Sequence, residues 1–222
     1  MADNVIAIDG PAASGKSTVA GLIADKLGIP CINTGNMYRA ITFYALEQGL
    51  NLTECTEEKL RPVLNSINLS YVKTASGNYE IMLNGTFPGA KIRTPEVASF
   101  VSSVSALPCV RTWLVDKQRE LARLGLTVME GRDIGTVIFP NAKYKFFVTA
   151  SPEERARRRL AQAGETPDGA TIESVAKAIA ERDLLDSSRK VAPLKKADDA
   201  ILIDTTGMTI DEVIEYILRS IK

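Results

Sequence analysis

The chain has 222 residues, with 27 Lys and Arg against 27 Asp and Glu, so its formal net charge at pH 7 is zero. Its 45% hydrophobic and 24% charged residues are typical of a folded protein and exclude a disordered chain. The balanced charge argues against a dedicated nucleic-acid binder, and the absence of histidine excludes catalytic triads and metal sites built on imidazole.

The chain begins with alternating strand and helix patterns. Residues 5–8 form a short, β-branched apolar run, which predicts a buried strand. A turn rich in Gly, Pro and Ala leads to residues 17–27, where apolar side chains recur at helical spacing. Residues 31–32 predict a second strand, and residues 36–48 a second helix that ends before Gly49.

The stretch from about residue 60 to residue 95 has a different pattern. Residues 68–72 and 79–85 alternate polar and apolar side chains, and residues 74–78 between them have turn composition. This pattern predicts an antiparallel hairpin with one solvated face, as a small β module inserted beside a parallel core. Thr86 and Phe87 are a candidate start for a third strand of this module.

Strand and helix patterns alternate again in the second half of the chain. Helices are predicted over residues 97–122 with an interruption near Pro108, from the cap at Ser151 to residue 162, over 172–185 and over 209–222. Strands are predicted over residues 126–130, 144–150 and 200–204, and a loop over 164–169. Strands that alternate with helices predict an α/β protein with a mostly parallel sheet.

The strongest local pattern is the run GPAASGKS at residues 10–17, which matches the phosphate-loop pattern G-x-x-x-x-G-K-[ST] in full. Glycines let the backbone N–H groups approach a phosphate closely, and the following helix directs its N-terminus at the anion. Lys16 supplies a point charge for the β- and γ-phosphates, and the Ser17 hydroxyl is a ligand for Mg²⁺. We therefore predict that the chain binds a nucleoside triphosphate.

Arginines indicate which kind of phosphate-loop protein this is. No guanine-reading N-K-x-D motif occurs, which argues against a GTPase, and we interpret Asp204 as a strand cap. Arginines lie at the ends of predicted elements or in loops at positions 39, 111, 132, 182 and 189, and cluster on one helix at 155, 157, 158 and 159. Planar guanidinium groups suit a kinase that must neutralise two nucleotides in one site.

Several ordered motifs together resemble the bacterial cytidylate kinases, the short-chain CMP/dCMP kinases of the nucleoside monophosphate kinase group. The resemblance spans nearly the whole chain and rests on IDGPAASGKST at 8–18, TGNMYR at 34–39, IRTPEV at 92–97, GRDIGTV at 131–137, FP at 139–140, Arg182-Asp183, Asp186, Arg189 and APL at 192–194. It implies Mg²⁺-assisted transfer of a phosphoryl group from ATP to CMP or dCMP.

The same resemblance implies a three-layer P-loop fold with a central parallel sheet, helices on both faces, a lid and an inserted antiparallel β module. The chain would form one unit over residues 1–222. Its core would comprise residues 1–34, 96–150 and 190–222, its monophosphate-binding region with the β insert residues 35–95, and its lid residues 151–189.

Site residues follow from the resemblance position by position. ATP would be held by Gly10, Pro11, Ala12, Ala13, Ser14, Gly15, Lys16, Ser17 and Thr18, with Ser17 also on the metal. The transferring phosphoryl group would be stabilised by Lys16, Arg132, Arg155, Arg159 and Arg189, with Arg158 a weaker candidate. The acceptor nucleotide would contact Thr34, Tyr38, Arg39, Ser102, Arg111, Arg132, Asp133, Arg182, Asp186 and Arg189.

Within this set, Ser102, Arg111 and Asp133 are the implied readers of cytosine. A carboxylate accepts a hydrogen bond from the exocyclic amino group of cytosine, whereas an arginine or hydroxyl donates to O2 and N3. Uracil would place a carbonyl against the same carboxylate.

Other readings remain open. The acceptor could be UMP, AMP or a small molecule that is not a nucleotide, or the chain could bind ATP without turnover and associate with nucleic acid. Asn33 stands where the family pattern has Asp, Thr34 is bulkier than Ser, and Leu184, Leu185, Ser187 and Ser188 replace more charged residues. Thr34 could shift the preference between CMP and dCMP.

The remaining features concern location and partners. No apolar run approaches ~18 residues, and residues 1–4 lack the pattern of a signal peptide, so we expect a cytoplasmic protein without membrane or nucleic-acid partners. Cys31, Cys55 and Cys109 are odd in number and far apart, which suits neither a disulfide framework nor a zinc site. We expect a monomer.

Overall fold

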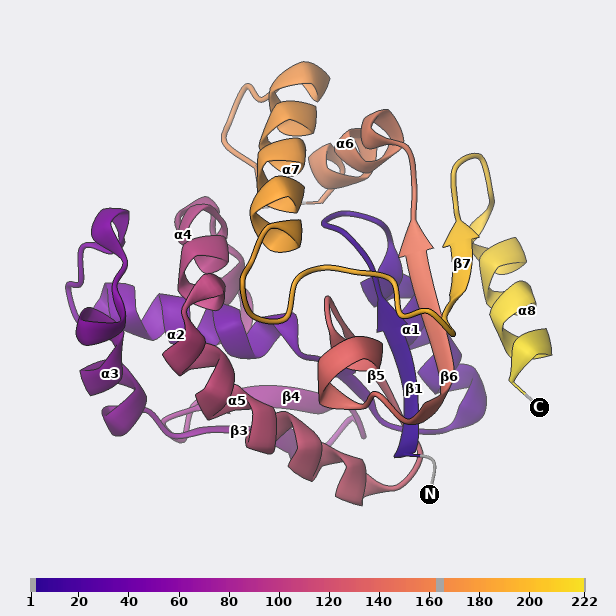
Figure 1. The fold of residues 1–222 in the computed structure, drawn as a ribbon, viewed down its shortest axis with the longest axis horizontal. Helices are drawn as coiled ribbons and strands as arrows, with labels where there is room; N and C mark the ends of the chain where they lie inside the picture. The colour runs from indigo at the N-terminus through magenta and orange to yellow at the C-terminus, as the bar shows by residue number, and fades with distance from the viewer. Residues whose placement is uncertain (1–2, 163–165, 222) are drawn as a thin grey trace.

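A computed structural model of the protein describes residues 3–162 and 166–221. Its centre is a parallel five-stranded sheet with the strand order β2-β5-β1-β6-β7 (Figure 1). The strands are β1 (Asp3–Asp9), β2 (Cys31–Asn33), β5 (Thr127–Gly131), β6 (Ala142–Thr149) and β7 (Ile201–Asp204). Every pairing within this sheet is parallel, so the α/β prediction is confirmed.

Both faces of the sheet are covered. Ile6 and Ile8 of β1 pack on one face with α1 (Lys16–Leu27) and α8 (Ile210–Ser220). Alternate residues of the same strand lie on the other face, where the short π-helix η4 (Ile134–Ile138), the 3-10 helix η3 (Leu121–Leu124) and one side of the hairpin cover them. Burial on both faces explains why β1 is apolar throughout rather than alternating, and it confirms the predicted three-layer arrangement.

A second apolar core lies beside the sheet, on the left of Figure 1. It joins α2 (Gly35–Glu47), α3 (Glu57–Ser66), α4 (Pro95–Ala106) and α5 (Pro108–Glu120) with the hairpin of β3 (Leu69–Lys73) and β4 (Tyr79–Leu83). The hairpin is antiparallel, as predicted. Because α4 and the first half of α5 pack in this core, we propose that the monophosphate-binding region extends beyond the predicted boundary at residue 95.

Two features of the inserted module differ from the sequence prediction. Helix α3 was not predicted, although Thr56 caps it by accepting a hydrogen bond from the Lys59 amide and two glutamates occupy its first turn. The third strand predicted at Thr86 and Phe87 is wrong, because Thr86 makes only an isolated bridge to Leu83. Asn84 and Gly85 both adopt positive φ there and turn the chain toward the 3-10 helix η2 (Gly89–Arg93).

The lid region consists of α6 (Pro152–Leu160) and α7 (Ile172–Ser187), which pack on each other above the sheet in Figure 1. Ser151 caps α6 and Pro152 is its first residue, as predicted. The loop predicted over 164–169 lies partly outside the described residues, namely at positions 164 and 165.

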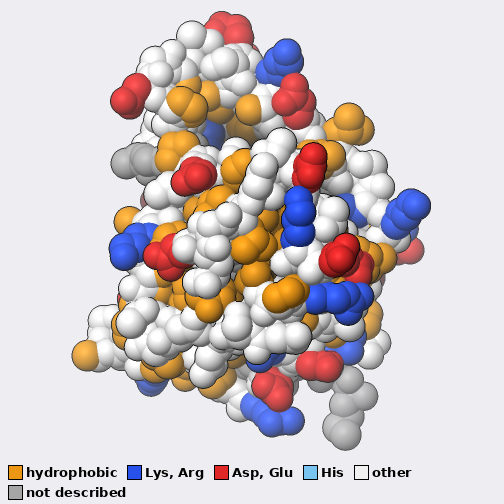
Figure 2. Space-filling model, turned by 90° about the vertical axis from the view of Figure 1, so that its left-hand side faces the viewer, with side chains coloured by type: hydrophobic (Ala, Val, Ile, Leu, Met, Phe, Trp, Pro, Cys, Tyr) orange, Lys and Arg blue, Asp and Glu red, His pale blue; other side chains and the backbone are white. Residues whose placement is uncertain are grey.

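The surface offers no obvious patch of one charge on the side shown in Figure 2, where acidic and basic side chains are interspersed. Within residues 3–162 and 166–221, no single helix is long and apolar enough to span a membrane. Helices α4 and α5, extended to Leu124, pass that test only as a pair, and the pair is bent by 91°.

The core beside the sheet gives the first prediction. Leu60 of α3 is completely buried, so Leu60→Ala should lower the free energy of unfolding by about 2–5 kcal/mol, through lost apolar transfer and the cavity left behind. Urea unfolding followed by circular dichroism measures this change. Leu184→Ala is the matched control, because Leu184 is 68% exposed and its truncation should change the free energy by less than about 0.5 kcal/mol. Equal effects of the two substitutions would contradict the assigned core.

Candidate active site

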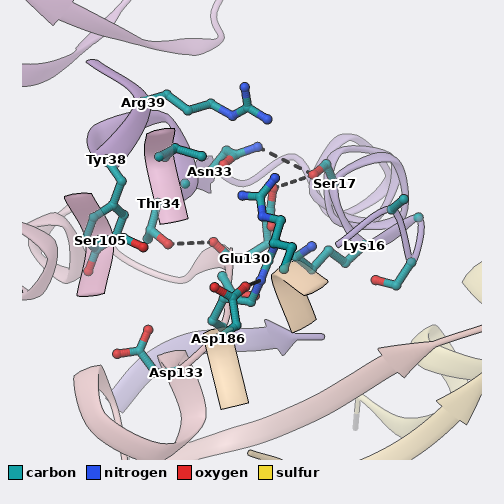
Figure 3. Close-up of a pocket in the computed structure, with 18 of the residues that line it drawn as sticks. Lys16, Ser17, Asn33, Thr34, Tyr38, Arg39, Ser105, Glu130, Asp133 and Asp186 are labelled. Carbon is teal, nitrogen blue, oxygen red and sulfur yellow. Dashed lines mark hydrogen bonds and ion pairs between the residues drawn. The ribbon is translucent and has the colours of Figure 1, made fainter. Parts of the chain in front are cut away.

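One pocket lies at the carboxyl ends of β1 and β5, where open α/β sheets place their ligands. Its lining brings together segments that are far apart in the chain, as Figure 3 shows. Among the described residues, its cationic lining side chains are Lys16, Arg39, Arg93, Arg111, Arg132, Arg159, Arg182 and Arg189, and its acidic ones are Glu130, Asp133 and Asp186. Eight cations against three carboxylates leave an excess of five positive charges in a chain whose net charge is zero.

The phosphate loop forms one side of this pocket. Residues 13–18 line the cavity, whereas Gly10, Pro11 and Ala12 are not part of its lining. Gly15 has a φ of 86° and precedes the first residue of α1, so the N-terminus of that helix meets the pocket. A Cβ on Gly10 would lie 2.0 Å from the Val148 carbonyl oxygen, so the loop can approach β6 closely only with glycine there.

Lys16 lies against the loop with its Nζ donating to the Pro11 carbonyl oxygen at 3.0 Å. Burial, and secondarily the charge of Arg132, lowers the pKa of Lys16 to about 7. Without a bound anion the ammonium charge is therefore held weakly, and an added phosphate would favour it.

Ser17 and Glu130 together offer oxygen atoms for a cation. The Ser17 hydroxyl donates to Glu130 Oε1 at 2.5 Å and accepts from Asn33 Nδ2 at 3.5 Å (Figure 3). No group of three or more His, Cys, Asp or Glu side chains in the described parts of the chain could hold a metal ion. This pair fits Mg²⁺, which commonly takes one or two protein oxygens and completes its shell with phosphates and water.

Glu130 was not among the residues predicted from the sequence. The available signal was its position as the acid that ends the predicted strand 126–130. Arg93 was also missed, although it lies within one of the motifs of the resemblance. Its guanidinium donates to Asn36 Oδ1 at 3.1 Å, and it lines the pocket close to Arg39.

The start of α2 forms the opposite side of the pocket. Thr34 is buried and its hydroxyl donates to the Glu130 carbonyl oxygen at 2.9 Å. One turn later, Arg39 donates to the Ile92 carbonyl oxygen at 3.2 Å, and burial together with Arg93 lowers the pKa of Arg39 to about 10. Tyr71 of β3 donates to the Asn33 carbonyl oxygen at 2.5 Å, which attaches the hairpin to this side of the pocket.

Arg111 and Asp133 form a buried ion pair at the far end of this surface. The Arg111 guanidinium also lies 5.5 Å from the centre of the Tyr38 ring. Both members of the pair line the pocket, as does Tyr38, so three of the predicted acceptor residues are brought together. Ser102, the remaining predicted base reader, does not line it; Ser105, one helical turn later, does.

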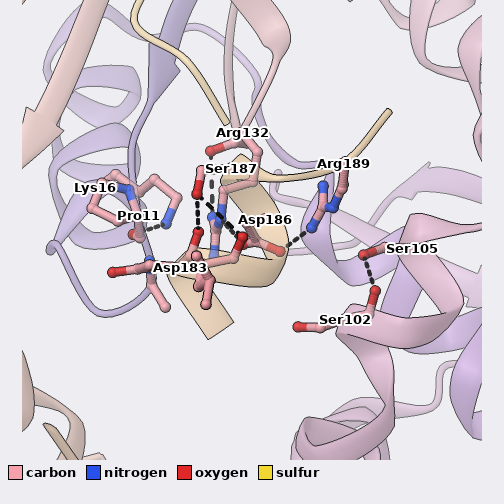
Figure 4. Close-up of polar contacts among 12 residues, drawn as sticks. Pro11, Lys16, Ser102, Ser105, Arg132, Asp183, Asp186, Ser187 and Arg189 are labelled. Atoms are coloured by element: carbon pink, nitrogen blue, oxygen red, sulfur yellow. Dashed lines mark hydrogen bonds and ion pairs between the residues drawn. The ribbon is translucent and has the colours of Figure 1, made fainter. Parts of the chain in front are cut away.

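Asp186 holds two of the arginines in place (Figure 4). Its carboxylate accepts from Arg132 Nε at 3.0 Å and forms a second ion pair with Arg189. Burial alone would raise the pKa of Asp186, but Arg132 and Arg189 outweigh it and lower that pKa. Arg182 lies beside them, where burial and Arg132 lower its pKa to about 9. Asp186 thus lines the pocket while its carboxylate is engaged by Arg132 and Arg189.

Of the four arginines on α6, at positions 155, 157, 158 and 159, only Arg159 lines the pocket. Arg155, predicted to stabilise the transferring group, is buried behind the phosphate loop, where it donates to the Ala12 and Ala150 carbonyl oxygens and pairs with Asp183. It lies one turn nearer the start of α6, where α7 covers it. Arg155 therefore stabilises the phosphate loop through a hydrogen bond to its backbone, whereas Arg159 faces the pocket.

Two further residues from the sequence analysis make structural contacts outside the pocket lining. Arg158 donates to the Ser14 carbonyl oxygen at 3.2 Å and to Thr205 Oγ1 at 2.8 Å, which joins the phosphate loop to the segment after β7. Asp204 accepts from the backbone and hydroxyl of Thr206 and lies outside the pocket lining, as expected for a strand cap.

Asp9 connects the two sides of the pocket. Its carboxylate accepts hydrogen bonds from the backbone N–H groups of Ile134 and Gly135, each at 2.8 Å. Burial raises the pKa of Asp9 to about 7, although both N–H groups favour the charged form. Asp9 precedes the phosphate loop, and Ile134 follows Asp133, so this contact joins the strand before the loop to the turn that carries Asp133.

A phosphate loop that faces a second anion-binding surface across one pocket can hold a phosphoryl donor and an acceptor together. The fold and the site therefore define a P-loop phosphotransferase.

Comparison with known proteins identifies the family. The model of the cytidylate kinase family matches residues 6–222. Curated cytidylate kinases of Clostridium botulinum (strain Okra / Type B1) and Bacillus subtilis (strain 168) are 47% and 45% identical to this chain over 222 and 217 residues. These alignments cover 100% and 98% of this chain and 99% and 96% of the relatives. The chain belongs to the cytidylate kinase family, which confirms the resemblance found in its motifs.

A solved structure supports the fold alone. The crystal structure of an uncharacterized protein from Eubacterium ventriosum ATCC 27560 matches with a TM-score of 0.53 at 14% identity. The match covers 98% of this chain and 97% of that chain.

The lowered pKa of Lys16 predicts that ATP binding takes up protons. With a pKa of about 7, Lys16 is half charged at pH 7 and largely uncharged at pH 8 in the free protein, whereas bound phosphates raise its pKa, so binding at pH 8 should draw in up to about one proton. Because a proton binds with the ligand, affinity should fall by up to about tenfold per pH unit between pH 7 and 9. Calorimetry in two buffers of different ionisation enthalpy measures the uptake.

The control for this experiment is Lys16→Gln, which should bind ATP more weakly and without the extra proton. Uptake should also vanish near pH 6, where Lys16 is already charged. An identical uptake in the variant and the original protein would assign the proton to another group.

Proposed function

We propose that the protein transfers the γ-phosphoryl group of ATP to CMP or dCMP, giving ADP and CDP or dCDP. The observation that carries this proposal is the excess of five positive charges in one pocket that also contains a phosphate loop and a buried Arg–Asp pair. Two phosphorylated substrates bring several negative charges into one site, and these side chains match that charge. Membership of the cytidylate kinase family supports the same reaction.

The donor side would work mainly by positioning. The backbone N–H groups of the loop and the N-terminus of α1 would bind the phosphates of ATP, and Lys16 would reach the β- and γ-phosphates. Ser17 and Glu130 are the side chains that would hold Mg²⁺ together with the nucleotide. When bound, Mg²⁺ would neutralise charge on the phosphates.

The acceptor side would bind the monophosphate through Arg39, Arg93 and Arg132. Arg132, Arg159 and Arg189 would stabilise the charge on the phosphoryl group during in-line transfer, and Arg182 would add to the same field. A protein base is unnecessary because the attacking oxygen belongs to a phosphate that is already ionised. This is consistent with a chain that has no histidine.

The Arg111–Asp133 pair supports cytosine as the acceptor base. Asp133 keeps acceptor capacity for an amino group, and Arg111 keeps donors for the ring nitrogen and O2. Uracil would bring a carbonyl oxygen against the carboxylate, which is repulsive. Thr34 lines the same pocket and is a candidate for setting the preference between CMP and dCMP.

The reaction is tested by an acceptor panel. ADP release with ATP and Mg²⁺ should be fast with CMP and dCMP, weak with UMP and nearly absent with AMP, GMP or no acceptor. Strong turnover with UMP or AMP alone would keep the kinase and overturn the assignment of the base site. ATP binding without release of ADP for any acceptor, accompanied by salt-dependent binding to DNA or RNA, would favour a binding protein instead.

The proposed metal site is tested by Glu130→Gln, which removes a charge without changing the size of the side chain. The Mg²⁺ concentration for half-maximal rate should rise about tenfold, equivalent to about 1.4 kcal/mol of lost binding. Rates measured across a Mg²⁺ titration at saturating ATP and CMP give this value. Glu120→Gln, at an exposed site on α5, is the control and should titrate like the unmodified protein. An unchanged Mg²⁺ requirement in Glu130→Gln would remove Glu130 from the metal site.

A further inference from the structure

Ser105 is a pocket residue that neither the motifs nor the comparisons assign. It lies near the end of α4 and is only 7% exposed, and it lines the pocket together with Val101 of the same helix face. Figure 3 shows it beside Tyr38, on the side of the pocket that carries Asp133. It therefore faces the region where the base of the acceptor nucleotide would lie.

The Ser105 hydroxyl has a defined hydrogen-bonding state. Its Oγ donates to the Ser102 carbonyl oxygen at 3.1 Å, within α4 (Figure 4). A serine hydroxyl has one proton and two lone pairs, so this bond uses its only proton. No donor to the Ser105 hydroxyl is present among the side chains and backbone groups that the structure describes. The oxygen consequently presents lone pairs to the pocket.

Arg111 links this oxygen to the buried ion pair. Its NH1 group donates to the Ser105 carbonyl oxygen at 3.1 Å, and its NH2 group pairs with Asp133. One guanidinium thus holds the end of α4 and the Asp133 carboxylate at the same end of the pocket. That end offers two acceptors, the Ser105 hydroxyl and the Asp133 carboxylate, with the arginine between them.

We propose that Ser105 is a specificity-determining residue of the acceptor site, whose hydroxyl oxygen accepts a hydrogen bond from the amino group of the acceptor base. An amino pyrimidine supplies two donors and can satisfy both acceptors. A carbonyl at the same position would face lone pairs, unless Ser105 gave up its buried bond to the Ser102 carbonyl. This inference rests on the proposed function and names a residue that would select the base of the acceptor nucleotide.

The test compares kcat/KM for CMP and for UMP in Ser105→Ala. Loss of one neutral hydrogen bond should lower kcat/KM for CMP about three- to tenfold. The value for UMP should stay the same or rise, so the CMP/UMP ratio falls. KM for ATP should be unchanged, because Ser105 lies on the acceptor side of the pocket.

Ser99→Ala is the matched control. Ser99 lies on the same helix and donates to the Glu96 carbonyl oxygen at 2.7 Å, in the same i to i−3 geometry, but it is exposed and outside the pocket. Its CMP/UMP ratio should equal that of the unmodified protein. A fall of the ratio in both variants would indicate a general effect on α4 and overturn the proposal.

Ser105→Cys covers the case in which the alanine variant does not fold. Cysteine has nearly the same size but is a weak acceptor, so the CMP/UMP ratio should fall here too. An unchanged ratio in a folded Ser105 variant would overturn the role of Ser105 and leave the proposed function intact. Absence of CMP phosphorylation by the unmodified protein would instead overturn the proposed function, and this inference with it.

Discussion

Mutual repulsion among eight cationic side chains in one pocket is the constraint on which the arrangement of this site depends. Carboxylates placed among them make the arrangement possible: Asp186 bridges Arg132 and Arg189, and Asp133 pairs with Arg111. The cations in the pocket lining still outnumber its carboxylates, and burial with neighbouring arginines lowers the pKa of Lys16, Arg159 and Arg182. Substrates with several negative charges would balance the positive charge of these side chains. Substrate binding would therefore also stabilise the cationic arrangement of the pocket.

The sequence predicted the parts of this molecule that depend on local periodicity or on a contiguous motif. The phosphate loop, the parallel strands and the hairpin belong to this group, and all three were found. The sequence did not predict which of two residues one helical turn apart faces the pocket. Arg155 and Arg159 are four apart, and Ser102 and Ser105 three apart, so both members of each pair share a helix face. Packing of α7 and α5 decides which member of each pair faces the pocket, and this packing depends on distant parts of the chain.

Helix α3 was missed for a different reason, because its capping signal lies just before the stretch that resembles a β module.

Hydrogen bonds join the segments that form the two sides of the site. Asp9 joins the strand before the phosphate loop to the turn after Asp133. The lid has its own connection, because Asp183 of α7 pairs with Arg155 and accepts from the Ala12 amide at 3.3 Å. In-line transfer requires donor and acceptor phosphates to be held at a fixed separation and angle. The contacts of Asp9 hold the end of β1 against the turn after Asp133 through backbone N–H groups.

The close approach of Gly10 to β6 also limits which amino-acid substitutions position 10 can accept during evolution. A side chain of any kind at that position would place its Cβ 2.0 Å from the Val148 carbonyl oxygen. Every amino acid that a single-base change in a glycine codon can produce carries a Cβ. Any single-base change that replaces this glycine by another amino acid would therefore displace the loop or the strand beside it. The codon for this position should accumulate only silent changes in any lineage that relies on the enzyme.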